Sequence, residues 1–409
     1  MALVGPSRGL GPRARRPSAA LGGTFVAAAL VAAALVAACG STPPVAPSAT
    51  AGPVATGGPG PSAAPTTATR DPGAAGVPAS RPTPSPTPAP TLAVAPLTGR
   101  LVARALTSRH PVAVMVDDHW AARPQSGFSE ASVVWQAPAE GGIPRYMMVF
   151  GEGDPPSVGP VRSARLYFVQ WAAEWNAVYV HVGGSPQAIG LLREKGQGQL
   201  VFDADEFRWG GLYLWRATDR SSPHNVYTDG AHLRALAKRV GAAAVGAKPA
   251  WRFADPAPLC RRPAGATIDL AYQYGRIGYR YDRPTNTWER SVDGRPQVDR
   301  ANDVRVAPAN VVVMEVAFGL LGPNQKGRLE AANIGRGRAW IATNGVVIEG
   351  TWRKTSIASP TRFYDADGRQ VTLVRGQTFV QVIPPGTPLT IVDGRVVIDP
   401  AKAAARGIR

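Results

Sequence analysis

The N-terminal segment constrains this chain most, because it indicates the compartment in which the rest must fold. Its basic residues come first, at Arg8, Arg13, Arg15 and Arg16. An apolar run of alanine, valine and leucine extends from about residue 25 to residue 36, and two alanines follow it. This order of basic, apolar and small residues is typical of a secretory signal. The apolar run is shorter than the roughly 20 residues of a membrane-spanning helix. Residues 1–38 are therefore predicted to be a signal peptide.

A cysteine, Cys39, directly follows the two alanines. The string from Leu35 to Cys39 resembles the lipobox of bacterial lipoproteins, in which this cysteine becomes the lipid-modified first residue of the mature chain. The resemblance implies a diacylglycerol and palmitate anchor on Cys39, at the extracytoplasmic face of the cell membrane. A plain secretion signal or a single membrane anchor is the alternative. Twin-arginine export through Arg15 and Arg16 remains open beside ordinary secretion.

Cysteine usage limits how the mature chain can be stabilised. Beyond Cys39 the chain contains only Cys260, so no intramolecular disulfide is expected and stability must come from packed cores. Cys260 lies in a stretch of proline and arginine that is typical of a connector. A half-buried, unreactive thiol is the favoured interpretation, although Arg261 and Arg262 would favour a thiolate.

Residues 39–98 consist of proline, alanine, threonine, serine and glycine, with almost no large apolar side chain. Such a composition cannot bury enough apolar surface to offset the entropy cost of ordering the chain. This segment is predicted to be a disordered tether that holds the folded part away from the membrane.

The net charge indicates which classes of partner this chain can attract. The formal charge of +17 falls to +13 without the four arginines of the signal. A strongly basic chain is attracted to anionic lipid head groups, wall polymers and acidic glycans. The expected export argues against nucleic acid as a partner.

The rest of the chain is long enough for two domains, and its pattern changes along the sequence. Residues 99–248 alternate strand-like and helix-like patterns, which predicts a mixed α/β domain. Its expected strands are 111–117, 132–136, 146–150 and 177–182, and its expected helices are 163–175, 186–193 and 230–240. After a linker at 249–263, residues 264–409 show β-type runs at 310–318, 339–343, 346–350, 378–383 and 396–398. The predicted fold class is α+β, with a mostly antiparallel β domain in the second half.

The densest polar block follows the first predicted strand. Asp117 ends the apolar run 111–117, at the position where α/β folds usually place ligand contacts. Arg123, Glu140 and Arg145 follow shortly afterwards. These side chains could line a polar pocket, or they could be loop residues that pair with one another.

Arg162 and Arg165 flank Ser163 at the predicted start of the helix 163–175. Ser163 suits an N-cap, and the backbone amides of a helix start already favour an anion. Arginine also binds phosphate, sulfate or carboxylate groups through two parallel hydrogen bonds. The pair could form an anion site, or both arginines could pair with Asp117 or Glu140 in a buried network, and neither interpretation is favoured.

Gly183, Gly184 and Ser185 join the strand 177–182 to the helix 186–193. The glycines permit close approach of a ligand to the backbone, but a tight turn is the favoured interpretation. Ser185 is expected to cap the helix.

His224 and Asn225 form the last polar block. If the protein is an enzyme, His224 is the best candidate for a general base, with Asp117 or Glu140 as acid. A structural role for this histidine is the favoured interpretation. The five histidines lack ligand-like spacing, so no metal is expected, and no motif indicates a cofactor.

Several strings along the chain resemble the YerB-like bacterial lipoprotein family, which has N-terminal and C-terminal domains of unknown function. Those strings are 111–117, 123–127, 140–142, 159–165, 179–186 and 223–225, then 350–354, 361–365 and 376–378. The resemblance extends from about residue 100 to residue 385 and implies two domains and a lipid anchor, but no activity. The family usually has asparagine where this chain has Asp118, which we expect to add a negative charge to the pocket.

We expect a membrane-tethered, extracytoplasmic binding or accessory protein of the cell envelope, without catalysis. Its partner would be an anionic wall polymer or a membrane-bound wall enzyme. The candidate binding residues are Asp117, Arg123, Glu140, Arg145, Arg162, Arg165, Gly183, Gly184, Ser185, His224 and Asn225. Two alternatives remain open: a secreted hydrolase of envelope polymers with His224 as base, and a scaffold that regulates a wall synthase.

Overall fold

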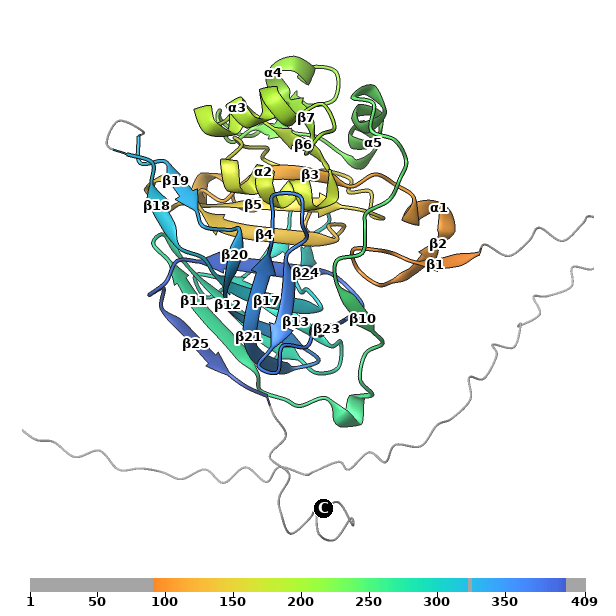
Figure 1. Cartoon of the computed structure of the whole chain (residues 1–409), viewed down its shortest axis with the longest axis vertical. Helices are drawn as coiled ribbons and strands as arrows, with labels where there is room; N and C mark the ends of the chain where they lie inside the picture. Colours follow the sequence, from red (N-terminus) through yellow and green to blue (C-terminus); the bar gives the residue numbers. More distant parts are fainter. Residues whose placement is uncertain (1–90, 323–325, 395–409) are drawn as a thin grey trace, which may run out of the picture. The chain divides into compact units, whose positions relative to one another are not determined.

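The computed structural model describes residues 91–322 and 326–394, and this part of the chain is mainly β, with few helices (Figure 1). The predicted signal peptide, Cys39, most of the predicted tether and the strand expected at 396–398 lie outside the described residues. None of the helices in the described part has the length and apolar character needed to cross a membrane.

The predicted tether ends too late in the chain, because residues 91–98 belong to the fold. β1 (Leu92–Val94) pairs antiparallel with β2 (Leu101–Ala103). Leu97 and Thr98 are buried, and Gly99 adopts a left-handed conformation with φ of 68° between the two strands. Leu97 supplies a large apolar side chain that is buried here, and the preceding proline-rich stretch has few such side chains.

Ten strands form one mixed sheet in the order β22-β21-β20-β17-β24-β4-β5-β3-β6-β7. The strands from the first half are β3 (Val112–Asp117), β4 (Val133–Pro138), β5 (Pro144–Phe150), β6 (Val178–His181) and β7 (Phe202–Asp205). Those from the second half are β17 (Asn310–Glu315), β20 (Gly335–Thr343), β21 (Val346–Lys354), β22 (Arg362–Asp365) and β24 (Thr378–Ile383). β4 pairs in parallel with β24, and every residue of both strands is buried. The two predicted domains therefore share one continuous sheet.

Side chains of β3 alternate between two hydrophobic cores, as the two-residue repeat of a strand requires. Val114 faces the core that α5 (Gly230–Arg239) covers. Met115 faces the core that α2 (Leu166–Ala172) and α3 (Pro186–Lys195) cover. The continuous apolar run of the sequence thus forms a strand that is buried on both faces.

The aromatic helix begins later than predicted. Arg165, not Ser163, occupies the N-cap position of α2, and its backbone is extended. Ala164 forms a parallel bridge with Gly184. The prediction of Ser163 as N-cap was wrong because this stretch pairs with a neighbouring segment before the helix starts.

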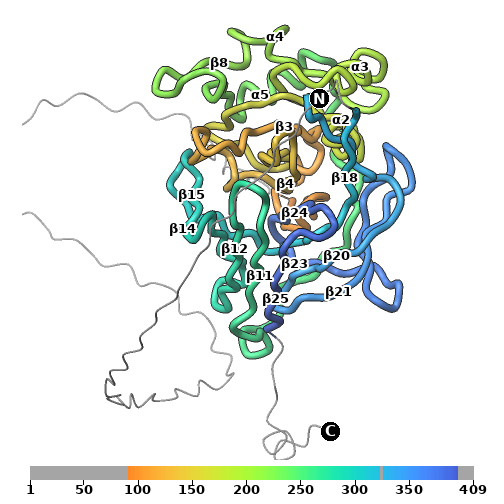
Figure 2. Tube along the Cα trace, turned by 90° about the vertical axis from the view of Figure 1, so that its left-hand side faces the viewer, coloured from red at the N-terminus to blue at the C-terminus, as the bar shows by residue number. Residues whose placement is uncertain are grey.

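A second sheet, with five antiparallel strands in the order β14-β13-β12-β11-β25, lies in the second half. Its strands are β11 (Thr267–Tyr272), β12 (Gly275–Asp282), β13 (Thr287–Val292), β14 (Arg295–Pro296) and β25 (Leu389–Val392). Alternate residues of β11 and β12 are buried, and the hydroxyl of Tyr272 donates to the carbonyl of Val382 in β24 at 2.9 Å. One face of this sheet therefore packs on the large sheet. Figures 1 and 2 show it at the opposite end of the described fold from α3 and α5.

The predicted linker at 249–263 also contributes to the fold. β10 (Arg252–Ala254) pairs in parallel with β23 (Thr372–Val374). Trp251 is buried, and its indole N–H donates to the carbonyl of Thr361. Cys260 is exposed in a short 3-10 turn, so the prediction of a half-buried thiol was wrong.

Short elements complete the described fold. They are α1 (Arg104–Thr107), α4 (Glu206–Trp209), β8 (Trp215–Arg216), β9 (Val226–Tyr227), β15 (Val298–Asp299), β16 (Val304–Arg305), β18 (Phe318–Leu320) and β19 (Leu329–Ala331), with the 3-10 turns η1 (Trp120–Ala122), η2 (Glu140–Gly142), η3 (Ala173–Trp175) and η4 (Leu259–Arg261).

Candidate functional site

Several polar blocks of the sequence meet at one edge of the large sheet. β3, β4 and β6 run in the same direction, so their carboxyl ends lie at this edge. Asp117 is the last residue of β3, and Glu140 follows β4 in η2. Arg145 lies at the same edge because β5 runs antiparallel and places Arg145 opposite Asp117. Carboxyl ends of strands commonly carry ligand contacts in α/β sheets.

Asp117 is the centre of the first group of polar contacts. Its side chain is nearly fully buried. One carboxylate oxygen, Oδ1, accepts a hydrogen bond from the backbone N–H of His119 at 3.1 Å. The other, Oδ2, lies 2.7 Å from Nδ1 of His224 and 3.0 Å from Nε of Arg162. Asp117 therefore holds a histidine and an arginine from two distant segments.

The backbone explains why those two segments reach Asp117. The N–H of Arg162 donates to the carbonyl of Met115 in β3 at 2.9 Å. On the other side, the N–H of Val161 donates to the carbonyl of Val226, close to His224 in the chain. The segment that carries Arg162 thus lies between β3 and β9.

Glu140 is the centre of the second group. Its Oε2 accepts a hydrogen bond from Nε of Arg165 at 2.8 Å, and Nη2 of Arg165 contacts the same oxygen. Nη2 of Arg145 lies 3.9 Å from that oxygen, and Nη1 of Arg145 donates to the carbonyl of Ser163 at 2.8 Å. Two arginines thus converge on one carboxylate.

Electrostatic interactions keep the side chains of Glu140 and Arg145 charged. Burial opposes ionisation of Glu140, but the hydrogen bonds and charge of Arg165 lower the pKa of Glu140 below its usual value. Burial, together with the neighbouring charge of Arg165, lowers the pKa of Arg145 to about 10. Both groups remain ionised at neutral pH.

Residues of both groups, but not His224, line one cavity of about 280 Å³, which we call the basic cavity. Its lining residues are Asp117, His119, Glu140, Ile143, Arg145, Arg162, Arg165, Lys326 and Arg328. Basic side chains outnumber acidic ones, and Lys326 and Arg328 form no ion pair within the described ranges. The cavity is therefore suited to an anion.

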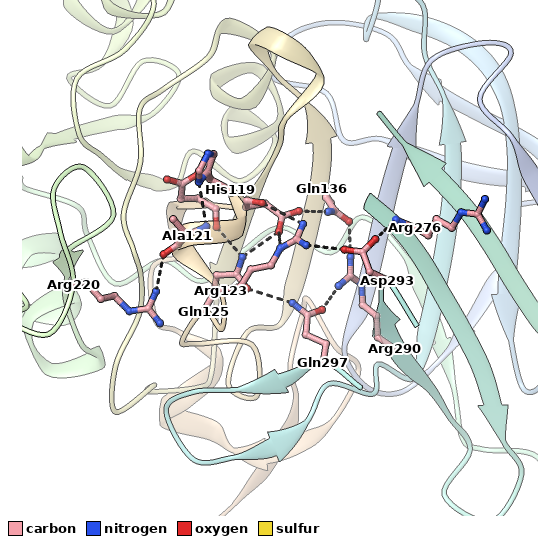
Figure 3. Close-up of polar contacts among 12 residues, drawn as sticks. His119, Ala121, Arg123, Gln125, Gln136, Arg220, Arg276, Arg290, Asp293 and Gln297 are labelled. Atoms are coloured by element: carbon pink, nitrogen blue, oxygen red, sulfur yellow. Dashed lines mark hydrogen bonds and ion pairs between the residues drawn. The ribbon is translucent and has the colours of Figure 1, made fainter. Parts of the chain in front are cut away.

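Arg123 lies outside the basic cavity. It pairs with Asp118 at 3.1 Å and with Asp293 at 3.3 Å, beside a different cavity of about 500 Å³ (Figure 3). Asp118 itself is buried and accepts further hydrogen bonds from the side chains of Gln125 and Gln136. Burial raises the pKa of Asp118, against the opposing charge of Arg123. The expectation that Asp118 adds charge to the pocket was wrong, because its side chain points into this buried network.

Gly183, Gly184 and Ser185 support the site through their backbone. The N–H of Ala164 donates to the carbonyl of Gly183, and the N–H of Ser185 donates to the carbonyl of Ala164. A Cβ atom on Gly184 would lie only 3.0 Å from that of Ala164. The glycines thus permit close packing against the segment that carries the arginines. The side chain of Ser185 accepts from the N–H of Ala188, which confirms its predicted helix cap.

Asn225 does not line the basic cavity either. Its side-chain oxygen accepts a hydrogen bond from Nη1 of Arg216 at 3.2 Å. This contact ties β8 to the segment before β9.

Sequence reasoning missed four residues that line the cavity: His119, Ile143, Lys326 and Arg328. His119 could have been included, because it stands two residues after Asp117 in the same polar block. Lys326 and Arg328 come from the second half of the chain and belong to no motif that would indicate a site. In the described residues, no group of three or more histidine, cysteine, aspartate or glutamate side chains is arranged to hold a metal ion.

The fold and the site define a mainly β protein in which both halves of the chain share one sheet and contribute to one basic cavity. Residues 97–243 match the N-terminal domain, and residues 268–380 the C-terminal domain, of the family described as protein of unknown function (DUF3048). The chain belongs to this family, which confirms the resemblance seen in the sequence.

Two comparisons place the chain within that family. It is 32% identical over 303 residues to the protein named "Putative lipoprotein YerB" of Bacillus subtilis strain 168, an alignment that covers 71% of this chain and 86% of the relative. The crystal structure of YerB from Bacillus subtilis matches with a TM-score of 0.65 and 29% sequence identity. That match covers 72% of this chain and 99% of the solved chain.

Proposed function

We propose that this chain is a membrane-anchored lipoprotein of the bacterial cell envelope that binds an anionic ligand in the basic cavity without catalysis. The observation that carries the proposal is the excess of basic side chains around one small cavity. Asp117 and Glu140 orient Arg162 and Arg165, so these arginines are held in place before a ligand arrives. Binding then costs little conformational entropy, because these side chains are already ordered.

The anchor is supported by the order of basic, apolar and small residues before Cys39. It is also supported by the name of the Bacillus relative, "Putative lipoprotein YerB". Labelling of cells with radioactive palmitate tests it. We expect label in the full-length chain and none in the Cys39→Ala variant. Equal labelling of both chains would exclude Cys39 as the lipidation site.

Ligand binding is tested with isolated cell envelopes and the purified full-length chain. We expect Arg162→Ala combined with Arg165→Ala to weaken binding at least tenfold, since hydrogen bonds to charged groups contribute about 1.5–3 kcal/mol each. The matched control is Arg336→Ala combined with Arg338→Ala, which removes the same charge from exposed positions of β20. Unchanged binding by the first variant would contradict the proposed site.

A second double variant separates a loss of binding from a loss of folding. Lys326 and Arg328 are less buried than Arg165 and form no ion pair within the described part. Replacing both with alanine should weaken envelope binding while the unfolding midpoint stays unchanged.

A hydrolase of envelope polymers is the second candidate, because Nδ1 of His224 lies 2.7 Å from Asp117. An aspartate in this position orients a histidine that acts as general base. Glu140 is a poor general acid, since Arg165 keeps its pKa low. Release of soluble fragments from purified envelopes, abolished by His224→Ala, would support this candidate over simple binding.

A further inference from the structure

Three aromatic rings form a row that leads from the protein surface to Asp117. Trp120 is 62% exposed, although a tryptophan usually buries most of its surface. Its ring centroid lies 3.6 Å from that of His119, and the ring of His119 stacks on that of His224 at 4.7 Å. His119 lines the basic cavity, and Trp120 packs against His119 from outside the cavity lining.

The middle ring is fixed and uncharged. Nδ1 of His119 accepts a hydrogen bond from the backbone N–H of Ala121 at 3.1 Å, which sets the orientation of the ring. Partial burial and the neighbouring His224 lower the pKa of His119, so the ring is neutral at neutral pH. Because the rings lie roughly face to face, the outer face of Trp120 is the free apolar surface beside the charged cavity.

The cavity also contains an acceptor without a donor. Oε1 of Glu140 is buried and accepts no hydrogen bond from another residue of the described part. A buried acceptor in this state is costly unless a ligand satisfies it. Glu140 lines the cavity, so a ligand hydroxyl bound beside it satisfies this oxygen once the carboxylate turns toward the ligand, while Lys326 and Arg328 are available for an acidic group.

We propose that the basic cavity binds an acidic sugar and that an adjoining sugar ring of the same glycan stacks on Trp120. A sugar acid, whether a carboxylate or a phosphate ester, supplies the three complementary features together: a negative charge, hydroxyl donors and an apolar ring face. Inorganic phosphate has no ring face, and an aliphatic amino acid has none either. This inference rests on the proposed function, because it names the chemical class of the anionic ligand.

Calorimetric titration of the full-length chain in detergent tests the inference. The probes are a galacturonic acid trisaccharide, a phosphorylated trisaccharide, the neutral trisaccharide maltotriose, and inorganic phosphate. We expect both acidic trisaccharides, or the one with the correct acid group, to bind more tightly than maltotriose and phosphate. Trp120→Ala should weaken that binding about tenfold and leave phosphate binding unchanged, whereas Trp120→Phe should retain most of the affinity.

Trp215→Ala is the matched control, since Trp215 is also exposed but its ring packs against His232 and not against the cavity residue His119. Acidic trisaccharides that bind through Arg162 and Arg165 but equally well to Trp120→Ala would overturn this inference and leave the proposed function standing. Absence of any anion binding that depends on these arginines would overturn both.

Discussion

Single buried charges hold the two halves of this molecule together. Arg290 in β13 is fully buried, and its Nη2 donates to Oε1 of Gln136 in β4 at 2.7 Å (Figure 3). Its Nε donates to the hydroxyl of Tyr279 at 2.9 Å. Asp118 lies in the same network: burial opposes the charge of Arg290, but Tyr146, Tyr279 and Asp118 together raise its pKa above the usual value. Each of these groups is costly to bury alone and is tolerated because the others satisfy it.

A second buried pair predicts a large loss of stability on substitution. Nζ of Lys354 lies 3.0 Å from Oε1 of Glu174, both side chains are fully buried, and Thr361 donates two hydrogen bonds to the same carboxylate. Lys354→Met leaves Glu174 unpaired, so we expect a loss of about 3–5 kcal/mol in the free energy of unfolding by urea.

The control for Lys354→Met is Arg338→Met, which breaks the exposed pair of Arg338 with Glu349. An ion pair on the surface contributes about 0–1 kcal/mol to the free energy of unfolding. If Lys354→Met costs no more than this control, the buried pair does not stabilise the fold.

Glu140 predicts a pH dependence of stability. The pKa of Glu140 is lower in the fold than its usual value of 4.5, because Arg165 stabilises the charged form. Such a group stabilises the fold above its unfolded pKa, and this contribution is lost as the pH falls through the folded pKa. Wild type should therefore exceed Glu140→Gln in unfolding free energy at neutral pH, and the difference should shrink below about pH 4.5. A difference that stays constant with pH would contradict the ion pair.

Among the elements, strand pairing at the edge of the large sheet depends on one glycine. Gly350 in β21 lies opposite Asp365 in β22. A Cβ atom there would lie 1.9 Å from the carbonyl oxygen of Tyr364, far inside contact distance. Because the obstacle is backbone, it cannot move without displacing the strand.

Gly350→Ala should therefore destabilise the protein by about 1–3 kcal/mol, the usual cost of overpacking. Gly319→Ala is the control, because Gly319 also lies in a paired strand but has no atom within 4 Å of the added carbon. Urea unfolding of both variants is the measurement. Equal unfolding free energies of the two variants would mean that β22 can move away from the added methyl group without loss of stability.

At the scale of the whole molecule, the shared sheet connects the two family domains. Val134 of β4 lies opposite Phe379 of β24, and both belong to one hydrophobic core. The buried contacts of Arg290 and Lys354 cross between the same halves. A cut between the domains would expose apolar strands on both sides.

We therefore expect the described part to unfold in a single transition rather than domain by domain. Buried tryptophans report on both halves, Trp135 and Trp171 on the first and Trp288 and Trp352 on the second. Tryptophan fluorescence and far-ultraviolet circular dichroism should give coincident urea curves. Two separate transitions would show that the halves are independent.

Local patterns in the sequence predicted many of the elements. The apolar run before Asp117 predicted β3, the spacing of Leu233 and Leu236 predicted α5, and Ser185 was recognised as a cap. These features depend on side-chain periodicity and hydrogen bonds between near neighbours, which the sequence displays directly.

Five of the predicted binding residues line the basic cavity: Asp117, Glu140, Arg145, Arg162 and Arg165. The sequence by itself determined that polar residues end the buried strands and that arginines stand beside them, because strand ends and charges are local properties. Only the tertiary structure decided that His224 meets Asp117, that Arg123 turns away to Asp118, and that the second half completes the cavity. Those outcomes depend on which strands pair and in which register, and pairing brings together residues far apart in the chain that share no local pattern.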